Sequence, residues 1–101
     1  MTRARLPDRR SAETLDLQHA GLRYTVTAGF YPDGRLGELF IRNHKAGNAS
    51  DTTARDGGIL ISLLLQHGCT VETIANAVSR NSDGTPAGVI GAVLELIARR
   101  P

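Results

Sequence analysis

The sequence predicts an α+β fold in which a short antiparallel β-meander of two or three strands precedes three α-helices packed on one of its faces. Apolar and polar residues alternate over residues 22–31, which is typical of a strand with one buried face. Beyond residue 50 the apolar residues recur at helical spacing instead. The 101 residues, of which 41% are in the set AVILMFWYC, suffice for one hydrophobic core. We expect a single domain over residues 13–101, preceded by a basic extended arm over residues 1–12.

Two strands are predicted in the first third of the chain. Alternation is weak over residues 14–19 and strong over residues 22–31, with Gly21 between the two runs. The strong run predicts a half-buried strand. Its buried face would carry Leu22, Tyr24, Val26, Ala28 and Phe30.

A tight turn and a further strand are predicted next. In the segment Tyr31-Pro32-Asp33-Gly34-Arg35, proline fixes the first dihedral angle of a turn, aspartate can accept a local backbone hydrogen bond, and glycine takes the positive φ. The second arm of this hairpin then covers residues 36–42. Leu39 and Ile41 share one face of the arm, and Glu38 and Phe40 share the other.

The first helix is expected to start in a polar loop and to end near His67. Ser50, Asp51 or Thr52 can cap it by accepting its first free backbone amides, and Gly68 can stop it. The helix is apolar on nearly every side over residues 59–65, which suits a helix between a sheet and another layer, or between two subunits. The pair Gly57-Gly58 costs helix propensity, so we expect tight backbone packing there.

Two shorter helices are expected to follow. Thr70 would cap the second, which has Val71, Ile74, Ala75 and Val78 at helical spacing. After a loop over residues 81–84, Thr85 and Pro86 stand where the cap and the first residue of a third helix are favoured. The core stripe of this helix would consist of Val89, Ile90, Val93, Leu94 and Ile97.

The net charge of +2 is divided unevenly along the chain. Four arginines and one aspartate in residues 1–10, together with Arg99 and Arg100, give the two ends +5, so residues 11–98 carry −3. A nucleic-acid surface needs a basic stripe on the folded body, and none is visible. The helix-turn-helix outline over residues 63–80 offers only Arg80 as an outward cation. We expect solvated termini, and DNA binding remains a minor alternative.

No segment predicts contact with a membrane. The longest apolar run, over residues 59–65, is interrupted by Ser62 and is far shorter than the ~20 residues needed to cross a bilayer. The basic start of the chain is not followed by the apolar region of an export signal. We expect a cytoplasmic location.

The residue pattern predicts no catalytic site, metal site or cofactor. Cys69 is the only cysteine, which excludes an internal disulfide and a four-cysteine zinc site. His19, His44 and His67 fall in different predicted elements without metal-ligand spacing. We therefore interpret all four residues as structural.

An acid in the middle of a predicted strand needs a partner if it is half-buried. Glu38 lies in this position, beside Phe40. We expect Arg23 or Arg42 on the neighbouring strand to form a cross-strand ion pair with it.

The loop before the first helix is the best candidate binding site. It combines two cations, a glycine and several hydroxyl or amide groups directly before a helix N-terminus, where free amides and a partial positive charge favour an anion. The spacing of a P-loop is missing, so the prediction rests on composition. The candidate anion-binding or nucleotide-binding residues are Arg42, Lys45, Gly47, Asn48, Ser50 and Thr52.

The order of motifs resembles the TSCPD domain over residues 6–98. The segments that carry this resemblance are Leu6-Pro7-Asp8-x-Arg10, a run from Tyr24 to an Asp33-Gly34 turn, Gly37-Glu38-Leu39-Phe40-Ile41, Gly47, Ile61-Ser62-Leu63-x-Leu65-x-x-Gly68, and a closing helix with Pro86. The family positions that it marks as structural are Asp33, Gly34, Gly37, Glu38, Phe40, Gly68 and Pro86.

The resemblance implies a link to ribonucleotide reduction without the chemistry itself. The TSCPD domain is found near the C-terminus of cobalamin-dependent, class II ribonucleotide reductases and also as small free-standing proteins. The segment that names the family would fall at residues 83–87, where only the proline is kept and Thr85 replaces the cysteine. One cysteine cannot supply both the radical-forming cysteine and the reducing pair that the reductases need, so we expect no reductase activity.

Two functions remain open at this point. The first is a non-catalytic accessory or regulatory module of deoxyribonucleotide metabolism that binds a nucleotide through the loop over residues 42–52, or binds a ribonucleotide reductase. The alternative is a structural protein, a homodimer that pairs through the apolar helix and the exposed edge of the hairpin.

Overall fold

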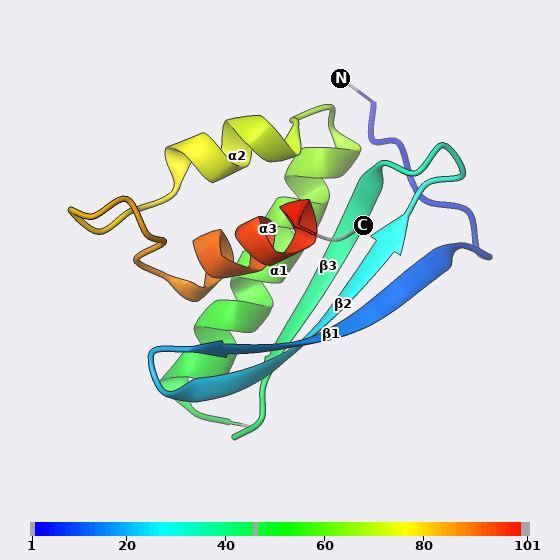
Figure 1. Cartoon of the computed structure of the whole chain (residues 1–101). Coiled ribbons are helices and arrows are strands. Elements are labelled where there is room, and N and C mark those ends of the chain that lie inside the picture. The colour runs from blue at the N-terminus through cyan, green and yellow to red at the C-terminus, as the bar shows by residue number, and fades with distance from the viewer. Residues whose placement is uncertain (1, 46, 100–101) are drawn as a thin grey trace.

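The computed structural model describes residues 2–45 and 47–99, and Met1, Ala46, Arg100 and Pro101 lie outside the described residues. Position 46 of the predicted anion loop and Arg100 of the basic C-terminal pair are therefore not described. The described residues form three strands and then three helices, which confirms the predicted α+β fold (Figure 1). The elements are β1 (Ser11–His19), β2 (Leu22–Phe30), β3 (Leu36–Asn43), α1 (Ala49–Gln66), α2 (Val71–Ala77) and α3 (Val89–Ala98).

The three strands form one antiparallel sheet in the order β1-β2-β3. The alternation that predicted β2 and β3 is confirmed, because Val26, Ala28, Leu39 and Ile41 are all fully buried. Strand β1 begins at Ser11, earlier than its weak alternation indicated, because its polar first residues still pair with the end of β2.

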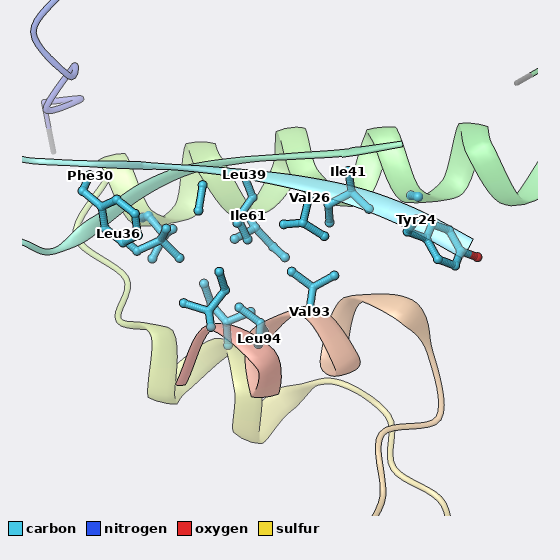
Figure 2. Close-up of a cluster of buried hydrophobic side chains, with 14 residues drawn as sticks. Tyr24, Val26, Phe30, Leu36, Leu39, Ile41, Ile61, Val93 and Leu94 are labelled. Atoms are coloured by element: carbon cyan, nitrogen blue, oxygen red, sulfur yellow. The ribbon is translucent and has the colours of Figure 1, made fainter. Parts of the chain in front are cut away.

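The core lies on one face of the sheet. Figure 2 shows Val93 and Leu94 of α3 reaching toward Val26 and Leu39 of the sheet and Ile61 of α1. Helix α3 therefore closes the core on the side opposite the strands. The buried cluster consists of Tyr24, Val26, Ala28, Phe30, Leu36, Leu39, Ile41, Ala54, Ile61, Leu65, Ile74, Val93, Leu94 and Ile97.

Helix α1 packs along the free edge of β3 through hydrogen bonds from buried polar side chains. The backbone N–H of Leu39 donates to Ser62 Oγ at 2.8 Å, and Gln66 Nε2 donates to the carbonyl of Gly37 at 2.9 Å. Near the other end of the strand, the N–H of Asn43 donates to Asp51 Oδ1 at 3.0 Å. We call Asp51, Ser62 and Gln66 the polar seam. It gives the unpaired edge of β3 the partners that a fourth strand would otherwise supply.

Gly58 allows α1 to approach β3 this closely. A Cβ atom at this position would lie 2.8 Å from the backbone oxygen of Leu39. The tight backbone packing predicted for the glycine pair is therefore confirmed at Gly58. At Gly57 a Cβ atom would instead meet the side chain of Ile90 in α3.

The outward side of α1 is apolar and exposed. Over residues 59–65, α1 was expected to lie between the sheet and another layer or between two subunits, and Ile59, Leu60, Leu63 and Leu64 are 51%, 61%, 37% and 46% exposed. We call these four residues the α1 strip. Because α1 lies beside β3 with its polar seam turned toward the strand, no second layer of the described residues covers the strip, and cover by a second subunit stays a prediction.

The predicted cap of α1 is wrong, and the predicted cap of α2 is confirmed. Asn48 caps α1 by accepting a hydrogen bond from the N–H of Asp51 at 2.7 Å, in place of the expected Ser50, Asp51 or Thr52. The carboxylate of Asp51 is not available as a cap because it is bonded to β3. Thr70 caps α2 as expected, accepting from the N–H of Thr73 at 3.1 Å.

Helix α3 starts three residues later than Thr85 and Pro86 indicated. Its cap is Gly88, without a side-chain hydrogen bond. Thr85 is instead held in a turn by Asp83, whose Oδ1 accepts from the backbone N–H of Thr85 at 2.9 Å, and Pro86 forms a β-bridge with Arg80. These local bonds compete with helix formation and delay it.

We predict that Gly58→Ala destabilises the chain although alanine favours helices. The substitution gains up to about 1 kcal/mol of helix propensity. The new methyl group, however, meets a backbone oxygen that cannot move without breaking the bond between Leu39 and Ser62. We expect a net loss of about 1–3 kcal/mol in the free energy of unfolding, measured by urea denaturation. Thr53→Ala, on the exposed side of α1, is the matched control and should stay within about 0.5 kcal/mol; equal stability of the two variants would contradict the close approach.

Candidate functional site

The loop predicted to bind an anion surrounds a carboxylate of the chain itself. Asp51 is 1% exposed. Its Oδ1 accepts hydrogen bonds from the N–H of Asn43 at 3.0 Å and from Arg42 Nε at 3.2 Å. Its Oδ2 accepts longer ones, at 3.4 Å, from the N–H of Gly47 and from Arg42 Nη2. Donors that could hold a phosphate are thus directed at Asp51.

The other predicted loop residues divide into two groups. Asn48 serves as the helix cap, and the Thr52 hydroxyl donates to its backbone oxygen at 3.4 Å. Lys45 is exposed, and its hydrogen bond uses the backbone N–H, which donates to Asn43 Oδ1 at 2.7 Å. Ser50 is half-buried. The structure therefore gathers Arg42, Gly47 and Asn48 around Asp51, and binding of an external anion by this loop stays a prediction.

The ion pair between Arg42 and Asp51 sets the charge state of the loop. Hydrogen bonds from the Arg42 guanidinium hold the pKa of the Asp51 carboxyl below its ordinary value. The N–H groups of Asn43 and Gly47 act in the same direction, while burial opposes them. The carboxylate is therefore ionised at neutral pH and balances one cation of the loop.

Glu38 has a partner from an unexpected part of the chain. Arg10 Nε donates to Glu38 Oε2 at 2.5 Å, and Arg10 Nη2 donates to Oε1 at 3.2 Å. The prediction that Arg23 or Arg42 pairs with Glu38 is therefore wrong. The Glu38 carboxylate lies over its cross-strand neighbour Gly29, where a Cβ atom would be only 2.3 Å from Oε2, and this places it within reach of the N-terminal arm.

The N-terminal arm is fastened to the fold, although a solvated end was expected. The N–H of Ala4 donates to the backbone oxygen of Gln66 at 2.7 Å, and the Tyr31 hydroxyl donates to the carbonyl of Ala4. The side chain of Leu6 packs where Gly37 leaves room for it. The basic segment seen in the sequence is thus part of the folded surface.

The arm forms one wall of a polar cleft of about 240 Å³, which we call the arm cleft. Arg3 Nε donates to Gln66 Oε1 at 2.6 Å, and a neutral amide leaves the guanidinium charge unbalanced. Arg5 is exposed and makes no hydrogen bond or ion pair with any residue that the structure describes. The residues that line the cleft are Arg3, Arg5, Leu6, Asp8, Arg10, Glu38 and Gln66. Sequence reasoning missed this site, and its one visible signal was the run of arginines in residues 1–10.

The positions marked by the family resemblance have structural environments. Gly34 takes φ +91° in the predicted turn, and Asp33 Oδ1 accepts from the N–H of Arg35 at 3.0 Å, as expected. Gly68 has φ +94° just after α1. Pro86 packs against Gly91 of α3. Phe40 is the exception, because its side chain is 52% exposed.

The cysteine and the histidines considered as catalytic or metal-binding residues do not cluster in the described structure. Cys69 is half-buried, and the three histidines contact different segments: His19 contacts the carbonyl of Ala87, His44 the hydroxyl of Thr25, and His67 the carbonyl of Leu63. Among the described residues, no group of three or more His, Cys, Asp or Glu side chains could hold a metal ion. Within residues 2–45 and 47–99, no helix has both the length and the apolar character needed to cross a bilayer.

Comparisons with known proteins agree on one family. The model of the TSCPD domain matches residues 2–100. A vitamin B12-dependent ribonucleotide reductase of Rhodopirellula baltica is 38% identical over 77 residues, which are 76% of this chain and 7% of the reductase. The reductase of the same name from Bradyrhizobium diazoefficiens is 37% identical over 74% of this chain and 6% of its own length. The reductase of the same name from Agrobacterium fabrum is 35% identical over 87% of this chain and 7% of its own length. The chain thus spans less than a tenth of these relatives. No solved structure matches it.

We predict that Asp51→Asn lowers stability in a pH-dependent way. Since the pKa of Asp51 is lower in the folded chain than in the unfolded chain, the ionised carboxylate stabilises the fold above the unfolded pKa of about 3.9, and this stabilisation is lost as the pH falls through the folded pKa. The melting temperature of Asp51→Asn should lie below that of the unaltered chain at pH 7, and the gap should close at lower pH. Asp16→Asn, at an exposed position of β1, is the matched control for the loss of a surface carboxylate. A gap that is independent of pH would contradict the role of the charge.

Proposed function

This chain belongs to the TSCPD domain family, and from that premise we propose that it is a non-catalytic binding module of deoxyribonucleotide synthesis that holds the phosphate groups of a nucleotide in the arm cleft. The observation that carries the proposal is the pair of arginines, Arg3 and Arg5, whose charges no ion pair balances in the described structure. Guanidinium groups bind phosphate oxygens through paired hydrogen bonds.

The arm cleft suits an anion better than the loop before α1. In the loop, Arg42 and the nearby N–H groups already bind the carboxylate of Asp51, so an incoming phosphate would have to compete with it. In the arm cleft, the Glu38 carboxylate is paired with Arg10, which leaves the guanidinium groups of Arg3 and Arg5 available. A phosphate there would meet two cations, with Asp8 as the remaining acid in the lining.

We further propose that the module acts together with a vitamin B12-dependent ribonucleotide reductase. In the relatives, the segment that matches this chain is a small part of a reductase chain. Direct binding to the reductase is the form of action that we propose for this chain. The sequence contains one cysteine, so the proposed role is binding and not reduction.

The nucleotide proposal predicts a charge-dependent affinity. Isothermal titration with ATP, dATP, CDP and dCDP should give a dissociation constant in the range of about 10 μM to 1 mM, as expected for a few exposed charge-assisted contacts. Arg3→Gln combined with Arg5→Gln should weaken binding about tenfold or more, and raised salt should weaken it as well. Arg55→Gln, an exposed arginine of α1, is the matched control. No heat with any of the four nucleotides, or an equal loss in the control, would refute the proposal.

The reductase proposal predicts a complex between separate chains. The purified chain and the B12-dependent reductase of the same organism should elute together in size-exclusion chromatography, at a volume earlier than either alone. Separate elution at concentrations of tens of micromolar, a range in which weak specific complexes are still populated, would count against a direct partnership and would leave the nucleotide result unaffected.

A further inference from the structure

One pocket lies where the first turns of α1 and α3 approach the turn between β1 and β2 (Figure 1). It has a volume of about 320 Å³, and we call it the helix-end pocket. Its lining includes Ser50 and Thr53 of α1, Gly88 and Val89 of α3, and Tyr24 of β2. It shares no lining residue with the arm cleft, so a ligand bound here would be independent of the phosphate proposed for that cleft.

Helix α3 brings uncapped backbone N–H groups to this pocket. Its first helical hydrogen bond runs from the N–H of Ala92 to the carbonyl of Gly88, and no side chain caps the helix. The N–H groups of Val89 and Ile90 therefore have no partner among the residues that the structure describes. Such an N-terminus carries a partial positive charge, which favours a bound anion.

Helix α1 adds a second N-terminus to the same pocket. Asn48 accepts from the N–H of Asp51, but within the described residues the N–H groups of Ala49 and Ser50 have no acceptor. The carboxylate of Asp51 also lies at this end of the helix, but it is paired with Arg42 and does not line the pocket. The pocket thus combines two helix N-termini, with no carboxylate among the described residues that line it.

The side chain of Tyr24 is buried at this pocket without a hydrogen bond for its hydroxyl. Tyr24 is 4% exposed. Figure 2 shows its ring at one end of the core, with the oxygen pointing away from Val26 and Val93. No described residue donates to this oxygen or accepts from it, and a buried hydroxyl without a partner costs stability. The described fold gives this hydroxyl no partner, and a ligand in the pocket would supply one.

We propose that the helix-end pocket binds the carboxylate of a small aliphatic acid. The carboxylate oxygens accept hydrogen bonds from the first N–H groups of α1 and α3 and from the Tyr24 hydroxyl. The alkyl part of the acid lies against Leu22 and the side chain of Val89, which are the larger apolar side chains of the lining.

The charge of the pocket suits an anion with one negative charge. Each helix N-terminus supplies roughly half a positive charge, so two of them supply about one. The described lining contains no lysine or arginine, the residues that bind the second charge of a phosphate. His19 also lines the pocket, where its Nε2 atom lies 3.4 Å from the carbonyl oxygen of Ala87 and joins two parts of the wall. A carboxylate is therefore matched by the two helices alone.

Butyrate is the probe that tests the proposal, in a titration of the nitrogen-15-labelled chain followed by NMR at constant ionic strength. The amide signals of Ser50, Val89 and Ile90 should shift together and saturate, with a dissociation constant of about 1–10 mM, as expected for a ligand of a few heavy atoms. 1-Butanol has the same alkyl chain without the charge, and inorganic phosphate at about pH 8 is mainly a dianion. Each should bind at least about fivefold more weakly than butyrate.

Two variants remove single donors from the pocket. Tyr24→Phe should weaken butyrate binding about two- to tenfold, the loss of one hydrogen bond, while the midpoint of urea unfolding stays the same or rises because the fold loses no bond. Ala49→Pro removes one N–H and should weaken butyrate binding about twofold or more. Proline is favoured at this first helical position, and the preceding Asn48 already has the extended conformation that proline requires (φ −89°, ψ 172°).

A control variant separates this pocket from the arm cleft. Arg3→Gln combined with Arg5→Gln changes the cleft alone and should leave the affinity for butyrate unchanged; a loss of affinity would place butyrate in the cleft and overturn the proposal. Absence of saturable shifts up to about 50 mM butyrate would overturn it as well. So would phosphate that binds as tightly as butyrate, or Tyr24→Phe with unchanged affinity for butyrate. A lower urea midpoint of Tyr24→Phe would assign the hydroxyl to the fold and overturn its role in binding.

Discussion

The contact between α1 and the free edge of β3 determines most of this structure. A sheet edge exposes unpaired N–H and carbonyl groups, and each one that is buried without a partner costs stability. Here Ser62 and Gln66 supply these partners from a helix, and Gly58 lets the helix backbone come close enough for them to reach. Helix α1 thus occupies the place of a fourth strand. Its other side does not contact β3 and carries exposed apolar residues.

This arrangement explains why the Asp51 carboxylate is buried while one face of the same helix is exposed. The first turn of α1 brings Asp51 under the end of β3, where its carboxylate binds the N–H of Asn43 and draws the Arg42 guanidinium onto itself. The same orientation turns the α1 strip outward. The charge of the loop and the exposure of the strip are therefore two consequences of one packing contact.

The sequence predicted those features that depend on local pattern. Period-two alternation placed the buried faces of β2 and β3, and Asp33 and Gly34 predicted their turn, because steric and local hydrogen-bonding rules act over a few residues. The polar seam was not predicted. Ser62 interrupts an apolar run and Gln66 precedes a helix end, so neither has a local reason to be buried; only the position of β3 gives one.

The contacts of the candidate site could not be predicted from local sequence pattern either. The pair between Arg10 and Glu38 joins residues 28 positions apart and needs the space left by Gly29 on a third segment, which no local pattern reveals. Likewise, the composition of the loop before α1 indicated an anion site, but composition cannot say that the nearest anion is Asp51 of the same chain. The late start of α3 has a related cause, because Asp83 binds Thr85 in a turn before a helix can form.

Gln66 connects the edge contact to the arm cleft. Its Nε2 donates to Gly37 of β3, its Oε1 accepts from Arg3, and its backbone oxygen accepts from the N–H of Ala4. One buried amide therefore closes the last part of the sheet edge and also fixes the first residues of the arm. Because a side-chain amide carries both donor and acceptor groups, it can satisfy β3 and orient a guanidinium without neutralising it, which a carboxylate could not do. The charge available in the arm cleft thus depends on the same contact that holds the sheet edge.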